Sequence, residues 1–108
     1  MLLDSEDGKS IKIEQIRYMQ EKIAEKPITS NKKIYIIDNS DTMTKEAQNC
    51  LLKTLEEPPE YAVIILLVSN ENNMLNTIKS RCKKIMFNPL SKEELLYYLN
   101  QNDMEIPN

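Results

Sequence analysis

The stretch Ile34-Tyr35-Ile36-Ile37-Asp38-Asn39-Ser40-Asp41 is the part of the sequence that decides the fold class. Consecutive β-branched and aromatic residues followed by a polar stop are typical of a buried β-strand. A second apolar run, residues 62–68, ends at Ser69-Asn70 in the same way. It is continuously apolar rather than alternating, which predicts a strand buried on both faces of a parallel sheet. The two runs together predict an α/β protein.

Helical patterns surround both predicted strands. Apolar residues recur at helical spacing over residues 11–24, and Pro27 ends that pattern. Thr44 is a suitable N-cap for a second helix, which carries an apolar stripe and ends at Pro58-Pro59. Helices that alternate with buried strands predict parallel βαβ units with right-handed crossovers. Further along, the patterns predict a short helix over 73–81, a third strand over 84–87 and a last helix over 91–102.

Polar residues stand at the ends of both predicted strands. Ligands of open parallel sheets bind beyond the carboxyl ends of the strands, and these ends are Asp38-Asn39 and Ser69-Asn70. The sequence therefore predicts a candidate site at this edge of the sheet. Asn and Asp are also common turn formers, so a purely structural role at the strand ends remains an alternative.

Composition excludes several classes of function. The chain has 108 residues and a formal net charge of −3, so it is long enough for one small domain at most. Because 14 Lys and Arg face 17 Asp and Glu, we expect no autonomous nucleic-acid binding and only indirect contact with DNA. The absence of histidine excludes a histidine-based metal site or catalytic dyad. No apolar run approaches the roughly 20 residues of a membrane helix and no signal-peptide pattern opens the chain, so we expect a cytoplasmic protein.

Two local features invite a functional interpretation that the sequence does not support. Cys50 and Cys82 fit neither a C-x-x-C pair nor a disulfide framework, so we expect free thiols that pack as small buried hydrophobes. Gly8-Lys9-Ser10 is similar to the end of a phosphate loop, but the further glycine that such a loop requires is replaced by Leu3. We expect a polar turn over residues 4–10 instead.

Four motifs carry a family resemblance. They are a Walker B-like strand at residues 34–39, an A-x-N-x-L-L-K-x-L-E-E-P-P helix at residues 47–59, a sensor 1-like strand at residues 64–70, and Ser80-Arg81-Cys82. With these motifs the chain resembles the clamp-loader branch of the AAA+ ATPases, and within it the delta-prime family of bacterial DNA polymerase III. The E-E-P-P helix and the S-R-C motif at this separation are specific, whereas a Walker B strand alone would be weak evidence.

The resemblance implies a partial AAA+ (RecA-like) parallel sheet with flanking helices over residues 1–108. In the family sheet, whose strand order is 5-1-4-3-2, residues 34–37, 62–68 and 84–87 would be strands 3, 4 and 5, and Leu2-Leu3 would end strand 2. We expect a fragment without the phosphate-loop strand, whose last helix leads towards the family's lid domain. The missing strand would leave an exposed sheet edge or one that self-association covers.

The S-R-C motif implies a catalytic arginine that acts in trans. Arg81 would be offered to the ATP-Mg of a neighbouring subunit, where a guanidinium stabilises the charge of the transferred phosphoryl group. Ser80 and Cys82 would set the backbone angle of the arginine, Cys82 by packing inward. An arginine at a helix end is otherwise a solvated charge close to the C-terminal dipole, and this alternative stays open.

The strand ends match degenerate nucleotide-binding positions of the family. Asp38 would orient magnesium, and Asn39 stands where active members carry the glutamate that positions the attacking water. Ser69 and Asn70 match the sensor 1 position. Because Asn39 is not a carboxylate, the resemblance implies a subunit that does not hydrolyse ATP. We expect no cofactor in this segment, which lacks a glycine-rich phosphate loop. For Asp38, the alternative is a turn residue at the end of a strand.

The leading interpretation is a non-hydrolysing subunit of the clamp loader, within the DNA polymerase III holoenzyme. The resemblance implies the gamma/tau and delta subunits as partners, with the sliding clamp and primed DNA reached through the complex. We expect no intrinsic enzymatic activity in this segment. A first alternative is a fragment of an active gamma/tau-like ATPase, against which Asn39 argues. A second is a plain α/β protein-interaction module with no nucleotide role.

Overall fold

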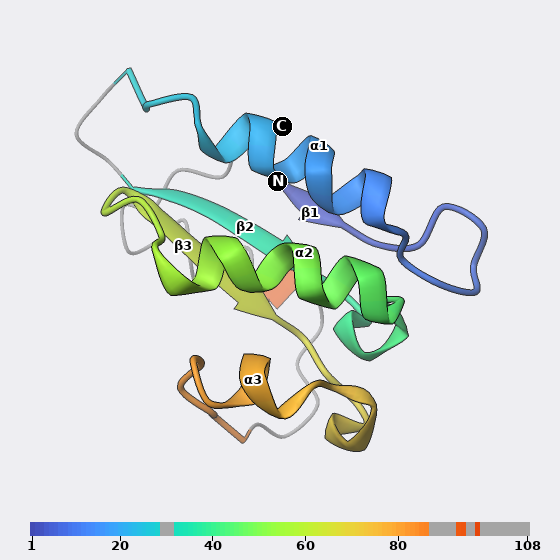
Figure 1. Cartoon of the computed structure of the whole chain (residues 1–108). Coiled ribbons are helices and arrows are strands. Elements are labelled where there is room, and N and C mark those ends of the chain that lie inside the picture. Colours follow the sequence, from blue (N-terminus) through green and yellow to red (C-terminus); the bar gives the residue numbers. More distant parts are fainter. Residues whose placement is uncertain (29–31, 87–92, 95–96, 98–108) are drawn as a thin grey trace.

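The computed structural model describes residues 1–28, 32–86, 93, 94 and 97. Its strands and helices alternate along the chain (Figure 1). In order they are β1 (Leu2–Leu3), α1 (Ile13–Ile23), β2 (Lys33–Ile37), the 3-10 helix η1 (Ser40–Thr42), α2 (Lys45–Glu56), β3 (Ala62–Leu66), the 3-10 helix η2 (Glu71–Asn73) and α3 (Asn76–Lys79). The predicted α/β class is confirmed.

The described strands form a parallel sheet in the order β1-β2-β3. Leu3 pairs in register with Ile37, and Ile37 pairs with Leu66, so the carboxyl ends of the three strands lie at one edge of the sheet. This order matches strands 2, 3 and 4 of the family sheet. The expectation that Leu2-Leu3 ends a strand beside residues 34–37 is therefore confirmed.

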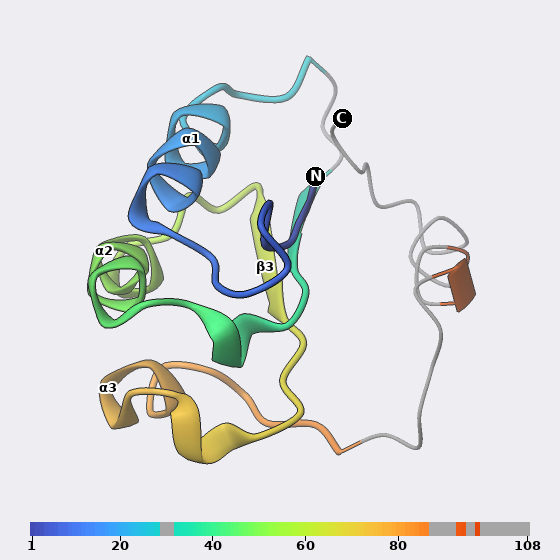
Figure 2. The same cartoon turned by 90° about the vertical axis from the view of Figure 1, so that its right-hand side faces the viewer.

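Helices α1, α2 and α3 lie on one side of the sheet, with α3 beyond the ends of the strands (Figure 2). Figure 2 shows α1, α2 and α3 in one column on the same side of the strands. Tyr35 and Ile37 of β2 point into the core on this side, together with Ile16 and Met19 of α1 and Leu51 of α2. Each of these side chains is fully buried, and full burial of an isoleucine or leucine contributes about 1.5 to 3 kcal/mol to stability. The apolar stripes of the helices are thus matched to one face of β2.

The opposite face of β2 forms a second apolar cluster. Ile34 and Ile36 alternate with the core residues, are fully buried, and pack against Val63, Ile65 and Leu67. Both faces of β2 are therefore buried, as expected of a buried strand. The prediction of burial on both faces applies to residues 62–68, and it is wrong there, because the five residues of β3 are all only partly buried. The reason is position: β3 is an edge strand of the described sheet and pairs only with β2 there.

The helix boundaries follow from their caps. Oγ1 of Thr44 accepts a hydrogen bond from the backbone N–H of Ala47 at 3.1 Å, which confirms Thr44 as the N-cap of α2. Helix α1 begins at Ile13 rather than at Ile11, because Ile11 donates to the carbonyl of Thr42 and accepts from the N–H of Thr44. Among the helices formed by described residues, no apolar helix reaches the length of a membrane span.

Three predicted elements differ from the structure or lie outside it. The short helix predicted over 73–81 is shorter in the structure, where α3 spans Asn76–Lys79. Asn73 is instead the last residue of the preceding 3-10 helix η2. The predicted strand over 84–87 is not formed in residues 84–86, where Ile85 and Met86 are exposed, and Phe87 lies outside the described residues. A strand requires a hydrogen-bonding neighbour, and none of the described strands pairs with this segment. The helix predicted over 91–102 lies outside the described residues except for positions 93, 94 and 97, which are helical.

Polar side chains join α1 to α2. Nε2 of Gln20 donates to the carbonyl oxygen of Cys50 at 2.8 Å and to Oγ1 of Thr54 at 2.9 Å. The Cys50 thiol in turn donates to Oε1 of Gln20 at 3.2 Å. Cys50 is half-buried and carries a free thiol, as expected, but it is hydrogen-bonded as well as packed.

A buried amide joins α2 to the segment that leads into α3. Gln48 is 2% exposed, and its Nε2 donates to the carbonyl oxygens of Asn73 at 3.0 Å and of Met43 at 3.3 Å. Its Oε1 accepts from the backbone N–H of Leu75 at 2.8 Å. Leu75 is the N-cap of α3, so Gln48 fixes where that helix starts. No local pattern singles out Gln48, because two of its three partners lie 25 and 27 residues away.

We predict that Gln48→Ala in the full-length protein lowers the free energy of unfolding by about 2 to 3 kcal/mol, because it removes a buried hydrogen bond to Met43 and two part-buried ones to Asn73 and Leu75. Urea denaturation followed by circular dichroism measures the change. Asn49→Ala is the matched control, since Asn49 is the next residue of the same helix and is exposed. We expect the control to change stability by less than about 0.5 kcal/mol. Equal losses in the two variants would contradict this account of Gln48.

Candidate functional site

The carboxyl ends of β1 and β2 are joined by side chains. Asn39 follows β2 in the left-handed conformation, with φ of 50°, which asparagine tolerates better than most residues. Its Nδ2 donates to Oδ1 and Oδ2 of Asp4, at 3.2 and 3.3 Å, and its backbone N–H donates to Oδ1 of Asp38 at 2.8 Å. Asp4 is a residue of this edge that sequence reasoning missed, because β1 is too short to be recognised from its own pattern.

The carboxyl ends of β2 and β3 are joined as well. The backbone N–H of Ser40 donates to the carbonyl of Leu67 at 2.9 Å, and the N–H of Asn70 donates to Oδ2 of Asp41 at 3.0 Å. Oδ1 of Asn70 accepts from the N–H of Asn72, so this side chain caps η2, while Ser69 is exposed. The structure thus brings the two predicted strand ends, 38–39 and 69–70, to one edge of the sheet.

The chemistry of this edge fits a magnesium ion only in part. Magnesium is commonly bound by one or two carboxylates together with phosphate oxygens and water, and Asp38 and Asp4 are the acidic side chains at the ends of β2 and β1. Within the part of the chain that the structure describes, no three acidic, cysteine or histidine side chains converge as a metal site would require. These residues would need phosphate oxygens from a bound nucleotide to complete such a site.

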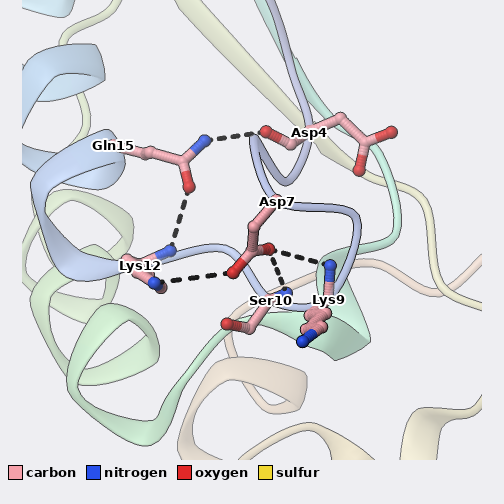
Figure 3. A network of polar contacts seen from close by, with 6 residues as sticks. All are labelled: Asp4, Asp7, Lys9, Ser10, Lys12 and Gln15. Atoms are coloured by element: carbon pink, nitrogen blue, oxygen red, sulfur yellow. Dashed lines mark hydrogen bonds and ion pairs between the residues drawn. The ribbon is translucent and has the colours of Figure 1, made fainter.

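The turn before α1 does not offer a phosphate cradle. Figure 3 shows Oδ1 of Asp7 accepting the backbone N–H groups of Lys9 at 2.8 Å and Ser10 at 3.0 Å, while Oδ2 pairs with Nζ of Lys12 at 3.5 Å. These backbone and lysine contacts lower the pKa of the Asp7 carboxyl below its usual value. The amides that would hold a phosphate are therefore occupied by the turn's own carboxylate. The interpretation of this segment as a polar turn is confirmed.

The same turn is anchored to α1. Nε2 of Gln15 donates to the carbonyl oxygen of Asp4 at 2.7 Å, and Oε1 of Gln15 accepts from the N–H of Lys12 at 3.1 Å (Figure 3). One side chain thus connects the end of β1 to the start of α1. The contacts explain why this turn has a defined shape without forming a binding loop.

Arg81 lies just after α3, at the surface. Its Nη1 donates to the carbonyl oxygen of Thr77 at 3.1 Å and to Oγ of Ser80 at 3.5 Å. Its Nη2 forms an ion pair with Oε1 of Glu56 at 3.3 Å, and 38% of its side chain is exposed. Glu56 is the last residue of α2 and the first glutamate of the E-E-P-P motif. The structure therefore joins two of the four family motifs through one ion pair, which no local sequence pattern signals.

Cys82 does not pack inward, so that expectation is wrong. Ile78 is the buried residue of α3, and Cys82 four positions later would share its face if the helix continued. The helix ends at Lys79, and Cys82 is exposed. Neighbouring atoms still desolvate the thiol enough to raise its pKa. Oγ of Ser80 accepts a long hydrogen bond from Nη1 of Arg81, at 3.5 Å.

An ion pair also holds the segment after the S-R-C motif. Nζ of Lys84 lies 2.7 Å from Oε2 of Glu71 in η2, and this contact lowers the pKa of the Glu71 carboxyl. The segment that carries Arg81 is thus bound to α2 on one side and to η2 on the other.

Comparisons with known proteins agree with the motifs and the fold. The model of the family described as "DNA polymerase III, delta subunit" matches residues 1–91. The delta' subunit of DNA polymerase III from Bacillus subtilis (strain 168) is 40% identical over 98 residues, which are 91% of this chain and 30% of the relative. The gamma subunit from Buchnera aphidicola subsp. Schizaphis graminum is 38% identical over 88 residues, which are 82% of this chain and 24% of the relative.

A solved structure shares the fold. The crystal structure of a DNA polymerase III gamma subunit-related protein from Thermotoga maritima superposes with a TM-score of 0.72 at 37% identity, over 85% of this chain and 31% of that protein. The chain thus spans about a third or less of the length of these relatives. The match of the family model over residues 1–91 shows that the chain belongs to the DNA polymerase III delta subunit family, as the resemblance to delta-prime indicated.

Proposed function

We propose that the protein containing this chain is a delta-prime-like subunit of the bacterial clamp loader, which lends Arg81 to ATP bound by a neighbouring subunit and does not hydrolyse ATP itself. The observation that carries the proposal is the surface position of Arg81, whose side chain is 38% exposed, within Ser80-Arg81-Cys82 in a chain of this family. The gamma/tau and delta subunits would be its partners. The sliding clamp and primed DNA would be reached through the complex.

The chemistry asked of Arg81 suits a guanidinium. Phosphoryl transfer spreads negative charge over the oxygens of the transferred group, and an arginine supplied by another protein accelerates such reactions by roughly 10³- to 10⁵-fold. The fixed fork of N–H donors matches phosphate oxygens better than a lysine ammonium does. Because its side chain is at the surface, Arg81 can meet a group that belongs to another subunit.

The chemistry asked of Asn39 supports the absence of intrinsic hydrolysis. A carboxamide carries no charge at neutral pH and cannot act as the carboxylate that positions the attacking water. The Asn39 amide also donates to both carboxylate oxygens of Asp4, so it already serves a structural contact. Asp38 would keep the capacity to orient magnesium.

The relatives also support one alternative. Gamma and tau subunits lie among them at 31% to 38% identity, so a fragment of an active gamma/tau-like ATPase is the second candidate. Asn39 favours the delta-prime-like proposal. A plain α/β interaction module is the third candidate, and the experiment on Arg81 separates it from the first.

We predict that Arg81→Ala in the full-length subunit lowers DNA- and clamp-stimulated ATP hydrolysis by the reconstituted loader at least tenfold, which corresponds to about 1.4 kcal/mol of barrier. Size-exclusion chromatography should show an intact complex. Arg17→Ala is the matched control, because Arg17 is the other arginine of the chain and is exposed on α1. An unchanged rate in Arg81→Ala with assembly intact would mean that the chain contributes to the loader only as architecture.

We predict further that the full-length subunit, purified alone, hydrolyses ATP no faster than its variant carrying Asp38→Ala and Asn39→Ala. The reason is that no carboxylate stands after Asp38 to position water. Phosphate release from subunits expressed without other loader proteins measures both rates. Hydrolysis by the wild-type subunit that the double variant abolishes would favour the gamma/tau-like alternative.

A further inference from the structure

The guanidinium of Arg81 contacts groups from two parts of the chain. Nη1 donates to Thr77 and Ser80, which belong to α3 or follow it directly. Nη2 pairs with Glu56 of α2, 3.3 Å away. Among the contacts that the described residues make with this guanidinium, the one to Glu56 fixes its direction relative to another element of the fold.

This ion pair contributes little to stability. The side chains of Arg81 and Glu56 are 38% and 46% exposed, so water and salt screen the pair. An arginine side chain has many rotamers, and a weak contact that selects one of them mainly changes orientation. The pair is therefore better suited to directing the guanidinium than to stabilising the fold.

The geometry also leaves room for a phosphate. In the ion pair Oε1 of Glu56 contacts Nη2, whereas Nη1 donates to Thr77 and Ser80, so the carboxylate and the two neutral acceptors use different nitrogens of the guanidinium. A guanidinium carries five N–H donors, and those not used by Glu56, Thr77 and Ser80 remain available to phosphate oxygens. The carboxylate consequently orients the group without blocking it.

We infer that Glu56 is a positioning residue for Arg81, which presents the guanidinium at the end of α3 in the direction of a neighbouring subunit's γ-phosphate. The inference rests on the proposed role of Arg81 and adds the residue that directs it. It also gives the two glutamates of the E-E-P-P motif different roles. In the described residues Arg81 forms an ion pair with Glu56, whereas Glu57 is exposed beyond the end of α2 and forms no ion pair with Arg81.

The test uses the full-length subunit in the reconstituted loader. We expect Glu56→Ala to lower the maximal rate of DNA- and clamp-stimulated ATP hydrolysis about three- to tenfold, with the KM for ATP changed less than about twofold, because a transition-state contact is misdirected. Glu56→Gln keeps an oxygen acceptor on a side chain of the same length and should restore at least half of the rate. Glu57→Ala is the matched control and should behave as wild type.

A double variant shows whether Glu56 acts through Arg81. In an Arg81→Ala subunit, Glu56→Ala should cause no further loss, whereas independent effects would multiply. A multiplied loss, a wild-type rate or an increased rate in Glu56→Ala would each overturn the inference. If Arg81→Ala lowers the rate while Glu56→Ala does not, the proposed role of Arg81 stands and the positioning role fails. If Arg81→Ala has no effect, the proposed function itself fails.

Discussion

The buried carboxamide of Gln48 determines how the helices that carry the candidate arginine are arranged. Its three hydrogen bonds satisfy groups on both sides of the contact between α2 and the start of α3. A polar group left without a partner at this contact costs about 1 to 3 kcal/mol. A shift of α3 along α2 would break these hydrogen bonds and is therefore unfavourable. The position of Arg81 follows from this constraint, because Arg81 lies directly after α3.

Two contacts of different kinds join α2 to α3, one at the start of α3 and one just beyond its end. At the start of α3 the contact is the buried, neutral amide of Gln48, and beyond its end it is the half-exposed ion pair of Glu56 with Arg81. A buried hydrogen bond has few alternatives, whereas an exposed ion pair exchanges readily with solvent or with another charged group. This asymmetry keeps the backbone of α3 in place, while the guanidinium of Arg81, which follows the helix and is directed by Glu56, stays accessible to another charged group.

Local signals in the sequence predicted the elements that depend on local physics. The β-branched runs located β2 and β3, and the Thr44 cap located α2. The predictions that were wrong concern the burial of β3, the strand expected over 84–86 and the packing of Cys82. Each of these depends on which tertiary neighbours are present or on where a helix ends, and neither is set by local sequence. The predicted strand ends do meet at one edge. Their contacts with Asp4, and the contact of Arg81 with Glu56, join residues 35 and 25 positions apart and have no sequence signature.

The geometry of Asn39 shows why a glutamate would not simply restore a catalytic carboxylate at this position. The backbone of Asn39 is left-handed, a conformation that costs most residues with a Cβ about 1 to 2 kcal/mol but that asparagine adopts more easily. Its amide donates to the carboxylate of Asp4, with nitrogen-to-oxygen distances of 3.2 and 3.3 Å. A glutamate would lose this donor, strain the backbone and bring a second negative charge towards Asp4. The end of β2 therefore favours asparagine at position 39, both for its backbone conformation and for its hydrogen bonds to Asp4.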